Sequence, residues 1–220
     1  MPSDQRKRQR KLERRAAKRK DKRHQLAVEQ SAGLAERLAD AARFPVLHAW
    51  ISEILWEEGL CWVLLSREIP GGSVAIALFL IDSYCIGVKD ALSRVVSRTT
   101  YQADFERKMK SELRARTVSP AMARKFVEAA AAYAFDLGFP PHPDYARAKL
   151  LFGTIDPGEC QEELELGDQG RPHFIAGPYD TALRCRQIVD TLTRSCGPGR
   201  FDVTLKEDIF GDEQDTRSDL

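Results

Sequence analysis

The sequence predicts an α+β protein in which two β-hairpins pack against several helices, with a long basic N-terminal helix or arm and a disordered acidic C-terminal tail. Residues 60–66 and 73–81 are rich in β-branched and large apolar side chains, and a Pro-Gly-Gly turn at 70–72 separates them. The Ser-Pro pair at 119–120 is a typical helix start. A second hairpin is indicated within residues 163–176.

The N-terminal part of the chain is predicted to be helical. Residues 6–43 are dominated by good helix formers and contain a single glycine. The first half of this stretch has almost no apolar face, so we expect it to stay unpacked until it meets a partner. After Pro45, apolar residues recur at intervals of three and four, which predicts a helix that ends at Gly59. Its apolar face comprises Val46, Leu47, Trp50, Ile51, Ile54 and Leu55.

The strand at residues 73–81 is apolar on both faces, so we expect it to be central in the sheet and covered by helices. The chain then leaves this strand through residues 82–90, and helices are predicted at 91–96 and 102–114. A longer helix is predicted at 120–137. Its buried stripe comprises Met122, Phe126, Ala129, Ala130, Tyr133 and Leu137.

Turn and strand signals alternate in the second half of the chain. Residues 163–166 and 172–176 flank a four-residue turn at 167–170, which predicts the second hairpin, with Pro172 limiting its strand to a sheet edge. The remaining predictions are a short helix at 145–151, an acidic loop at 156–163, a helix at 178–192, a strand at 201–205 and a disordered tail from Glu207.

Composition indicates one globular body. The chain has 220 residues, of which 43% are hydrophobic, and this is enough for a core. We divide the chain into a basic arm at 1–44, an α+β body at 45–206 and an acidic tail at 207–220. The longest apolar run is too short to cross a bilayer, and the N-terminus lacks the apolar segment of a secretory signal. A cytoplasmic protein without membrane contact is therefore expected.

The five cysteines contain no C-x-x-C pair, and they predict neither a disulfide framework nor a zinc ribbon. Cys61 and Cys85 lie in apolar surroundings, where a free cysteine behaves as a small hydrophobic side chain. A zinc site would require Cys160, Cys185 and His173 to converge from distant positions. We expect neither a metal nor another cofactor.

Charge is divided unevenly along the chain. Residues 1–24 hold about nine net positive charges, whereas the whole chain has a formal charge of +1, which leaves about −8 for residues 25–220. Such a segment attracts polyanions, and we expect it to contact the phosphates of RNA, DNA or the ribosome. Its twelve cations, the basic segment of residues 6–23, are Arg6, Lys7, Arg8, Arg10, Lys11, Arg14, Arg15, Lys18, Arg19, Lys20, Lys22 and Arg23.

Two other interpretations of the basic segment stay open. It can fold onto the chain's own acidic loop and tail or onto an acidic protein, or it can be a solvated terminus that keeps the protein soluble. Twelve cations in eighteen positions repel one another, which favours a partner that neutralises them. Phosphate contact gives little base specificity, and the segment has no aromatic residue for base stacking.

Two stretches of the chain resemble a bacterial family of conserved hypothetical proteins. They are residues 71–92, GGSVAIALFLIDSYCIGVKDAL, and residues 170–192, GRPHFIAGPYDTALRCRQIVDTL. Together they cover 45 residues, about a fifth of the chain. Because no activity is known for such a family, the resemblance implies no catalytic residue. It implies that both stretches belong to one ordered body.

Three candidate catalytic residues follow the apolar strand. Asp82 and Asp90 with Lys89 can hold Mg²⁺ beside a phosphate, as metal-dependent phosphodiester hydrolases do. The simpler interpretation is that Asp82 ends the strand or caps the next element, while the other two are surface residues. Their spacing alone does not distinguish these possibilities.

A weak candidate anion site lies at residues 177–181, which open a predicted helix with Arg184 and Arg186 nearby. Ordinary N-capping by Asp180 or Thr181 explains the same residues more simply.

The sequence as a whole favours a non-catalytic nucleic-acid-associated protein over an enzyme. A phosphodiester hydrolase centred on Asp82, Lys89 and Asp90 is one alternative. The other is an interaction subunit whose protein partner buries the region of Trp50 and Trp56.

Overall fold

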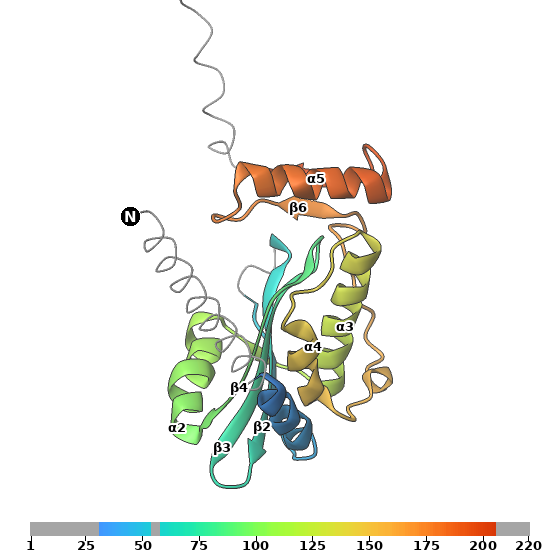
Figure 1. The fold of residues 1–220 in the computed structure, drawn as a ribbon. Helices are drawn as coiled ribbons and strands as arrows, with labels where there is room; N and C mark the ends of the chain where they lie inside the picture. Colours follow the sequence, from blue (N-terminus) through green and yellow to red (C-terminus); the bar gives the residue numbers. More distant parts are fainter. Residues whose placement is uncertain (1–30, 54–57, 206–220) are drawn as a thin grey trace, which may run out of the picture.

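The computed structural model describes residues 31–53 and 58–205. It confirms the α+β class, with an antiparallel five-stranded sheet in the order β4-β3-β2-β1-β5 and helices on both of its faces (Figure 1). The basic segment and the acidic tail lie outside the described residues. The strands are β1 (Val46–Ile51), β2 (Leu60–Ile69), β3 (Ser73–Asp82), β4 (Gly87–Ser97) and β5 (Arg116–Thr117).

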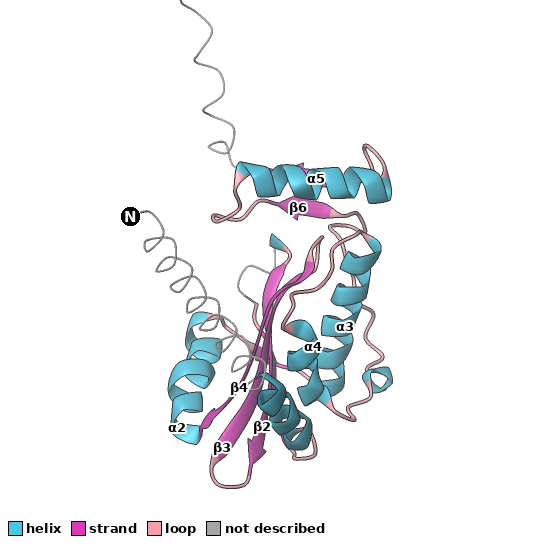
Figure 2. Ribbon diagram, viewed as in Figure 1, coloured by secondary structure: helices cyan, strands magenta, loops and turns pink. Residues whose placement is uncertain are grey.

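The helices form a layer on each face of the sheet, and α5 with β6 lies across one end of it (Figure 2). One face is covered by α2 (Arg98–Tyr101) and the helical turns η2 (Gln102–Glu106) and η3 (Lys108–Glu112). The other face is covered by the helix at 31–41, α3 (Pro120–Asp136), α4 (Tyr145–Ala148) and η4 (Lys149–Phe152). The remaining elements are η5 (Pro157–Glu159), β6 (His173–Ile175), α5 (Ala182–Cys196) and β7 (Asp202–Thr204).

Alternating strand residues fill a core on each face of the sheet. Val63 and Phe79 pack with α3, α4 and the helix at 31–41, whose Leu38 is fully buried. Leu64 and Ile76 face the opposite side, where α2 and the turns after it cover them. The prediction of a strand covered on both faces is therefore confirmed for β3, which lies between β2 and β4.

The first hairpin is confirmed, since β2 and β3 pair over their full length from Leu60–Asp82 to Ile69–Ser73. The helix start at Ser119 is also confirmed, because its side chain accepts a hydrogen bond from the Met122 N–H at 3.1 Å. Helical structure follows at the predicted positions 102–114 and 145–151, and α5 and β7 lie close to their predicted ranges.

Two predicted helices are wrong. Residues 46–51 form β1, which pairs with β2 on one side and β5 on the other. Because both faces of β1 are covered, its apolar residues form a nearly continuous run that also satisfies helical spacing. Residues 91–96 belong to β4, which pairs with β3 after a tight turn. The end of the first predicted helix, residues 54–57, lies outside the described residues.

The predicted second hairpin is also wrong. Residues 163–166 form no strand, and β6 instead pairs in parallel with β7, which comes after α5. The turn itself exists, because Asp168 and Arg171 exchange backbone hydrogen bonds of 2.8 and 3.0 Å. β7, which is distant along the chain, thus replaces the nearby residues 163–166 as the partner of β6. Among the described residues, no helix is long and apolar enough to cross a lipid bilayer.

Candidate functional site

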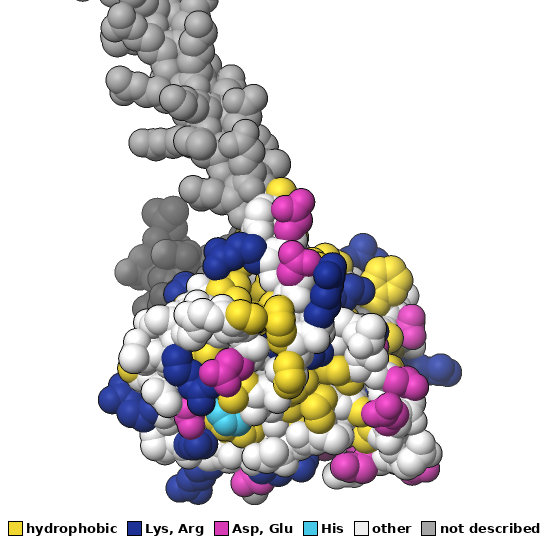
Figure 3. Space-filling model, turned by 90° about the horizontal axis from the view of Figure 1, so that it is seen from below, with side chains coloured by type: hydrophobic (Ala, Val, Ile, Leu, Met, Phe, Trp, Pro, Cys, Tyr) yellow, Lys and Arg dark blue, Asp and Glu magenta, His cyan; other side chains and the backbone are white. Residues whose placement is uncertain are grey.

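The twelve cations predicted to contact nucleic acid lie outside the described residues. The described part of the chain has 20 Lys and Arg residues against 22 Asp and Glu residues, a formal net charge of −2. Figure 3 shows basic and acidic side chains interspersed over the face of the molecule that is seen from below. The excess of positive charge is therefore concentrated in the first 24 residues.

Asp82, the first candidate catalytic residue, is the last residue of β3 and is 5% exposed. Its Oδ1 accepts hydrogen bonds from the backbone N–H groups of Tyr84 and Cys85, at 3.2 and 2.9 Å. Burial raises the pKa of Asp82 to about 6, and the positive charge of Lys89 acts in the opposite direction. These contacts hold the turn between β3 and β4.

Lys89 and Asp90 have other neighbours. Lys89 Nζ lies 3.8 Å from Asp180 Oδ2, in the segment before α5. Asp90 Oδ1 accepts a hydrogen bond of 2.7 Å from the next N–H along the chain and lies 3.6 Å from His142 Nε2. Within the described part of the chain, no three His, Cys, Asp or Glu side chains could together hold a metal ion. Asp82 and Asp90 thus have separate hydrogen-bond partners.

The segment before α5 is built from ordinary caps. Thr181 is the N-cap, and its side chain accepts a hydrogen bond from the Arg184 N–H at 3.2 Å. Asp180 Oδ2 accepts a hydrogen bond from the Gly177 N–H at 2.8 Å and also faces Lys89. The capping interpretation of this segment is confirmed.

The residues of the hypothetical zinc site are distributed over different parts of the fold. Cys160 and Cys185 are buried in separate hydrophobic clusters, one beside α3 and one beneath α5. Both ring nitrogens of His173 have partners, because Nδ1 lies 2.9 Å from Asp168 Oδ2 and Nε2 lies 2.9 Å from Thr204 Oγ1. The His173 side chain therefore connects β6, β7 and the turn before β6.

Trp50 is already used inside the fold. Its side chain is 3% exposed, and its Nε1 donates a hydrogen bond to Thr117 Oγ1 at 3.2 Å. Its ring also stacks on His48, with 4.1 Å between the ring centroids. Trp56 lies outside the described residues. The Trp50 ring is therefore already buried within the fold and offers little surface to a protein partner.

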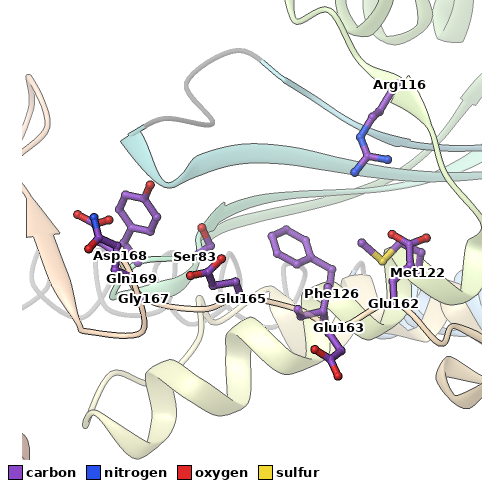
Figure 4. Close-up of a pocket in the computed structure, with 12 residues that line it drawn as sticks. Ser83, Arg116, Met122, Phe126, Glu162, Glu163, Glu165, Gly167, Asp168 and Gln169 are labelled. Atoms are coloured by element: carbon purple, nitrogen blue, oxygen red, sulfur yellow. The ribbon is translucent and has the colours of Figure 1, made fainter.

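A groove with acidic side chains, the acidic groove, opens between the end of β3, β5, α3 and the segment 162–169 (Figure 4). Its volume is about 430 Å³. Figure 4 shows Glu162 and Glu165 on either side of the Phe126 ring, with Arg116 across from them. The groove is lined by Ser83, Tyr84, Arg116, Met122, Phe126, Glu162, Glu163, Leu164, Glu165, Gly167, Asp168 and Gln169.

Hydrogen bonds to its backbone position the acidic wall of this groove. Lys125 Nζ, on α3, donates to the carbonyl oxygens of Cys160 and Glu162, at 3.0 and 2.6 Å. At the other end, the Gly167 N–H donates to the Ser83 carbonyl oxygen at 2.9 Å. The segment is thus held at both ends beside α3 and the end of β3.

Sequence reasoning missed the acidic groove because it assigned residues 163–166 to a strand. The signal available in the sequence was the alternation of Glu163 and Glu165 with two leucines, which indicates that the glutamates share one face of the segment. Leu164 and Leu166 do pack against the main core, and the two glutamates are exposed. The pattern therefore identified which side chains face solvent, but the pairing with residues 172–176 that it implied does not form, because β6 pairs with β7.

Tyr133, on α3, carries a buried hydroxyl without a hydrogen-bond partner among the described residues. Burial raises the pKa of Tyr133 to about 12. Because Tyr133→Phe removes a buried polar group and breaks no hydrogen bond, we expect the free energy of unfolding to stay the same or to rise by about 1 kcal/mol. Urea denaturation at pH 7 measures this change.

Tyr101→Phe is the matched control for that substitution. The Tyr101 hydroxyl lies 2.8 Å from His48 Nδ1 and 3.0 Å from Ser66 Oγ. Its removal should lower the free energy of unfolding by about 1–3 kcal/mol. Equal losses in the two variants would contradict the different environments of the two hydroxyls.

Comparisons with known proteins do not assign a role to these features. No family model, curated protein or solved structure matches the chain. A function is therefore inferred from the charges and contacts of its own residues.

Proposed function

We propose that this chain is a cytoplasmic, non-catalytic protein that associates with RNA, DNA or the ribosome through its basic segment. The contrast in charge supports this proposal. Residues 1–24 hold about nine net positive charges, whereas the described part of the chain holds a formal −2. A polyanion is therefore attracted to one end of the chain and gains little from the remainder.

The expected contact is with the phosphate backbone. Each Lys or Arg that neutralises a phosphate releases a condensed counterion, so the affinity falls steeply as the salt concentration rises. The basic segment contains no aromatic residue, and it therefore lacks the side chains that stack on bases. Binding of this kind has little sequence preference and holds the folded body close to the nucleic acid.

A salt series on the full chain tests this function. We expect the wild type to bind a fluorescein-labelled, unstructured single-stranded RNA with a steep linear dependence of log K on log salt. Six substitutions to Gln in the basic segment should reduce the magnitude of that slope by up to about 4, because each phosphate contact on a single strand contributes about 0.7. The substituted residues are Arg6, Lys7, Arg8, Arg10, Lys11 and Arg14.

A matched control removes six exposed cations from the body. These residues form no ion pair among the described residues, and their replacement by Gln should change the slope by less than about 1. An equal effect of both variants would show that RNA contacts cations over the whole surface of the protein. An unchanged slope in the variant of the basic segment would overturn the proposal. The control residues are Arg37, Arg107, Lys108, Arg114, Arg184 and Arg200.

A further inference from the structure

Three carboxylates of the acidic groove form no ion pair within the described part of the chain. Among the described residues, no ion pair involves Glu162, Glu163 or Glu165, although all three are exposed. The lysine or arginine that lines the groove is Arg116, and its Nε already lies 3.8 Å from Glu53 Oε1. Lys125 Nζ lies at the same wall, where it donates to backbone carbonyl oxygens. These two cations are fewer than the four carboxylates that line the groove, so an excess of negative charge remains.

The surface of the groove contains apolar side chains alongside its polar groups. Phe126 and Met122, both from α3, are 2% and 5% exposed and lie beneath the acidic wall. The ring of Tyr84 lines the end of the groove nearest to β6. Lys and Arg combine an aliphatic stem with a charged head, and a groove lined by both apolar side chains and carboxylates complements both parts.

We propose that the acidic groove binds a Lys/Arg-rich peptide segment, and that its occupant is the chain's own basic segment. The twelve cations of residues 6–23 are the densest positive charge in the chain. They are also covalently tethered, which provides a local concentration in the millimolar range that a separate peptide would not have. Charge complementarity and tethering together select this occupant.

The tether is long enough. The described chain begins at Ser31, whose Oγ accepts a hydrogen bond from Arg147 Nη1 at 2.9 Å. Arg14, near the middle of the basic segment, precedes Ser31 by 17 residues, which can span up to about 56 Å when extended. A domain of this size has a radius of gyration of about 16 Å. The segment can therefore reach the acidic groove from its attachment point.

Occupancy of the groove leaves most of the cations free. Four carboxylates at most, those of Glu162, Glu163, Glu165 and Asp168, face twelve cations. Exposed ion pairs are individually weak and are screened by salt, so a polyphosphate can displace the segment. The groove then acts as an internal competitor that lowers the affinity for nucleic acid. This regulatory consequence rests on the proposed function, whereas binding of the segment in the groove does not.

Zero-length carbodiimide cross-linking of the full chain tests groove binding without any nucleic acid. The reagent joins a lysine amine to a carboxylate in direct contact, and mass spectrometry of the digested covalent monomer identifies the pairs. We expect links from Lys7, Lys11, Lys18, Lys20 and Lys22 to Glu162, Glu163 and Glu165. Their yield should exceed by at least about fivefold the yield at three exposed acidic residues elsewhere that form no ion pair with another described residue. It should collapse at 0.5 M salt. The comparison residues are Glu36, Glu112 and Asp136.

Glu36 makes this comparison stringent, because it is much closer to the basic segment along the chain than the groove carboxylates are. Equal yields at all acidic residues, or a preference for Glu36, would overturn the proposal. Links confined to covalent dimers would overturn the choice of the chain's own segment as the occupant.

RNA binding provides the second measurement. The groove variant Glu162→Gln, Glu163→Gln, Glu165→Gln should bind the labelled RNA about 3–10-fold more tightly at low salt, since the competitor is lost. The variant Glu36→Gln, Glu112→Gln, Asp136→Asn changes the net charge equally and should gain less than twofold. Equal gains would show a general charge effect and remove the regulatory role. If no variant binds RNA, the proposed function fails, whereas the cross-links still test whether the basic segment binds in the groove.

Discussion

Arg67→Met is expected to lower the free energy of unfolding by about 3–5 kcal/mol. Arg67 is a residue of β2, and it is only 5% exposed. Its guanidinium donates hydrogen bonds to the carbonyl oxygens of Leu151 and Phe152, at 2.9 and 3.0 Å, and to that of Phe44. Methionine has a similar reach but no donor, so three carbonyl oxygens would each lose a hydrogen bond. The Phe152 oxygen would keep the one that it accepts from the Ile155 N–H at 3.2 Å. The same guanidinium connects the chain before β1 to the end of η4.

Urea denaturation at pH 7 measures this loss, and Arg94→Met is its control. Arg94 is an exposed arginine of β4, and its replacement should change the stability by less than about 0.5 kcal/mol. Arg67→Lys should recover only part of the loss, because an ammonium group does not reproduce the planar fork of a guanidinium. A loss below about 1 kcal/mol for Arg67→Met would show that the carbonyl oxygens find other partners.

Elements with strong local signals were predictable from the sequence. The turn at 70–72 and the β-branched and large apolar residues around it identified the β2–β3 hairpin, and Ser119 with Pro120 identified the start of α3. Local chemistry settled these cases because the turn and the cap stabilise their own neighbourhoods. The α+β class followed from them.

Elements that depend on distant partners were not predictable. β1 is a strand because β2 and β5 flank it, and its helical spacing of apolar residues is a by-product of burial on both faces. β6 finds its partner in β7, beyond α5, and not in the adjacent residues 163–166. In both cases tertiary pairing overrides the local pattern.

The candidate site shows the same division. Arg67, outside that site, directly follows the strand predicted at 60–66, but two of its three carbonyl partners are 84 and 85 residues away along the chain. The acidic groove likewise requires α3, the end of β3 and the segment 162–169 to come together. Asp82 was identified by its position after an apolar strand, whereas its hydrogen bonds to the turn became visible only in the fold. Sequence position thus identified the residue but not its role.

The buried carboxyl of Asp82 is expected to make stability depend on pH, and Asp82→Asn should remove that dependence. Burial raises the pKa of Asp82 from its ordinary value of 3.8 to about 6 in the folded protein. Between these values the folded state binds more protons than the unfolded state, so this group stabilises the fold at low pH and the contribution is lost as the pH rises through about 6. Relative to the Asn variant, the wild type should therefore lose about 2 kcal/mol between pH 4.5 and pH 7.5.

Three variants separate the charge of Asp82 from its hydrogen bonds. Asn keeps an oxygen that can accept from the N–H groups of Tyr84 and Cys85, whereas Asp82→Ala loses it and should be less stable than Asp82→Asn by about 1–3 kcal/mol at every pH. Asp90→Asn, at a position where the side chain is 54% exposed, should keep the pH dependence of the wild type. Urea denaturation from pH 4.5 to 7.5 compares all four proteins. If the wild type and Asp82→Asn change in parallel across this range, the Asp82 carboxyl has the same proton affinity in the folded and unfolded chain, and burial does not control its ionisation.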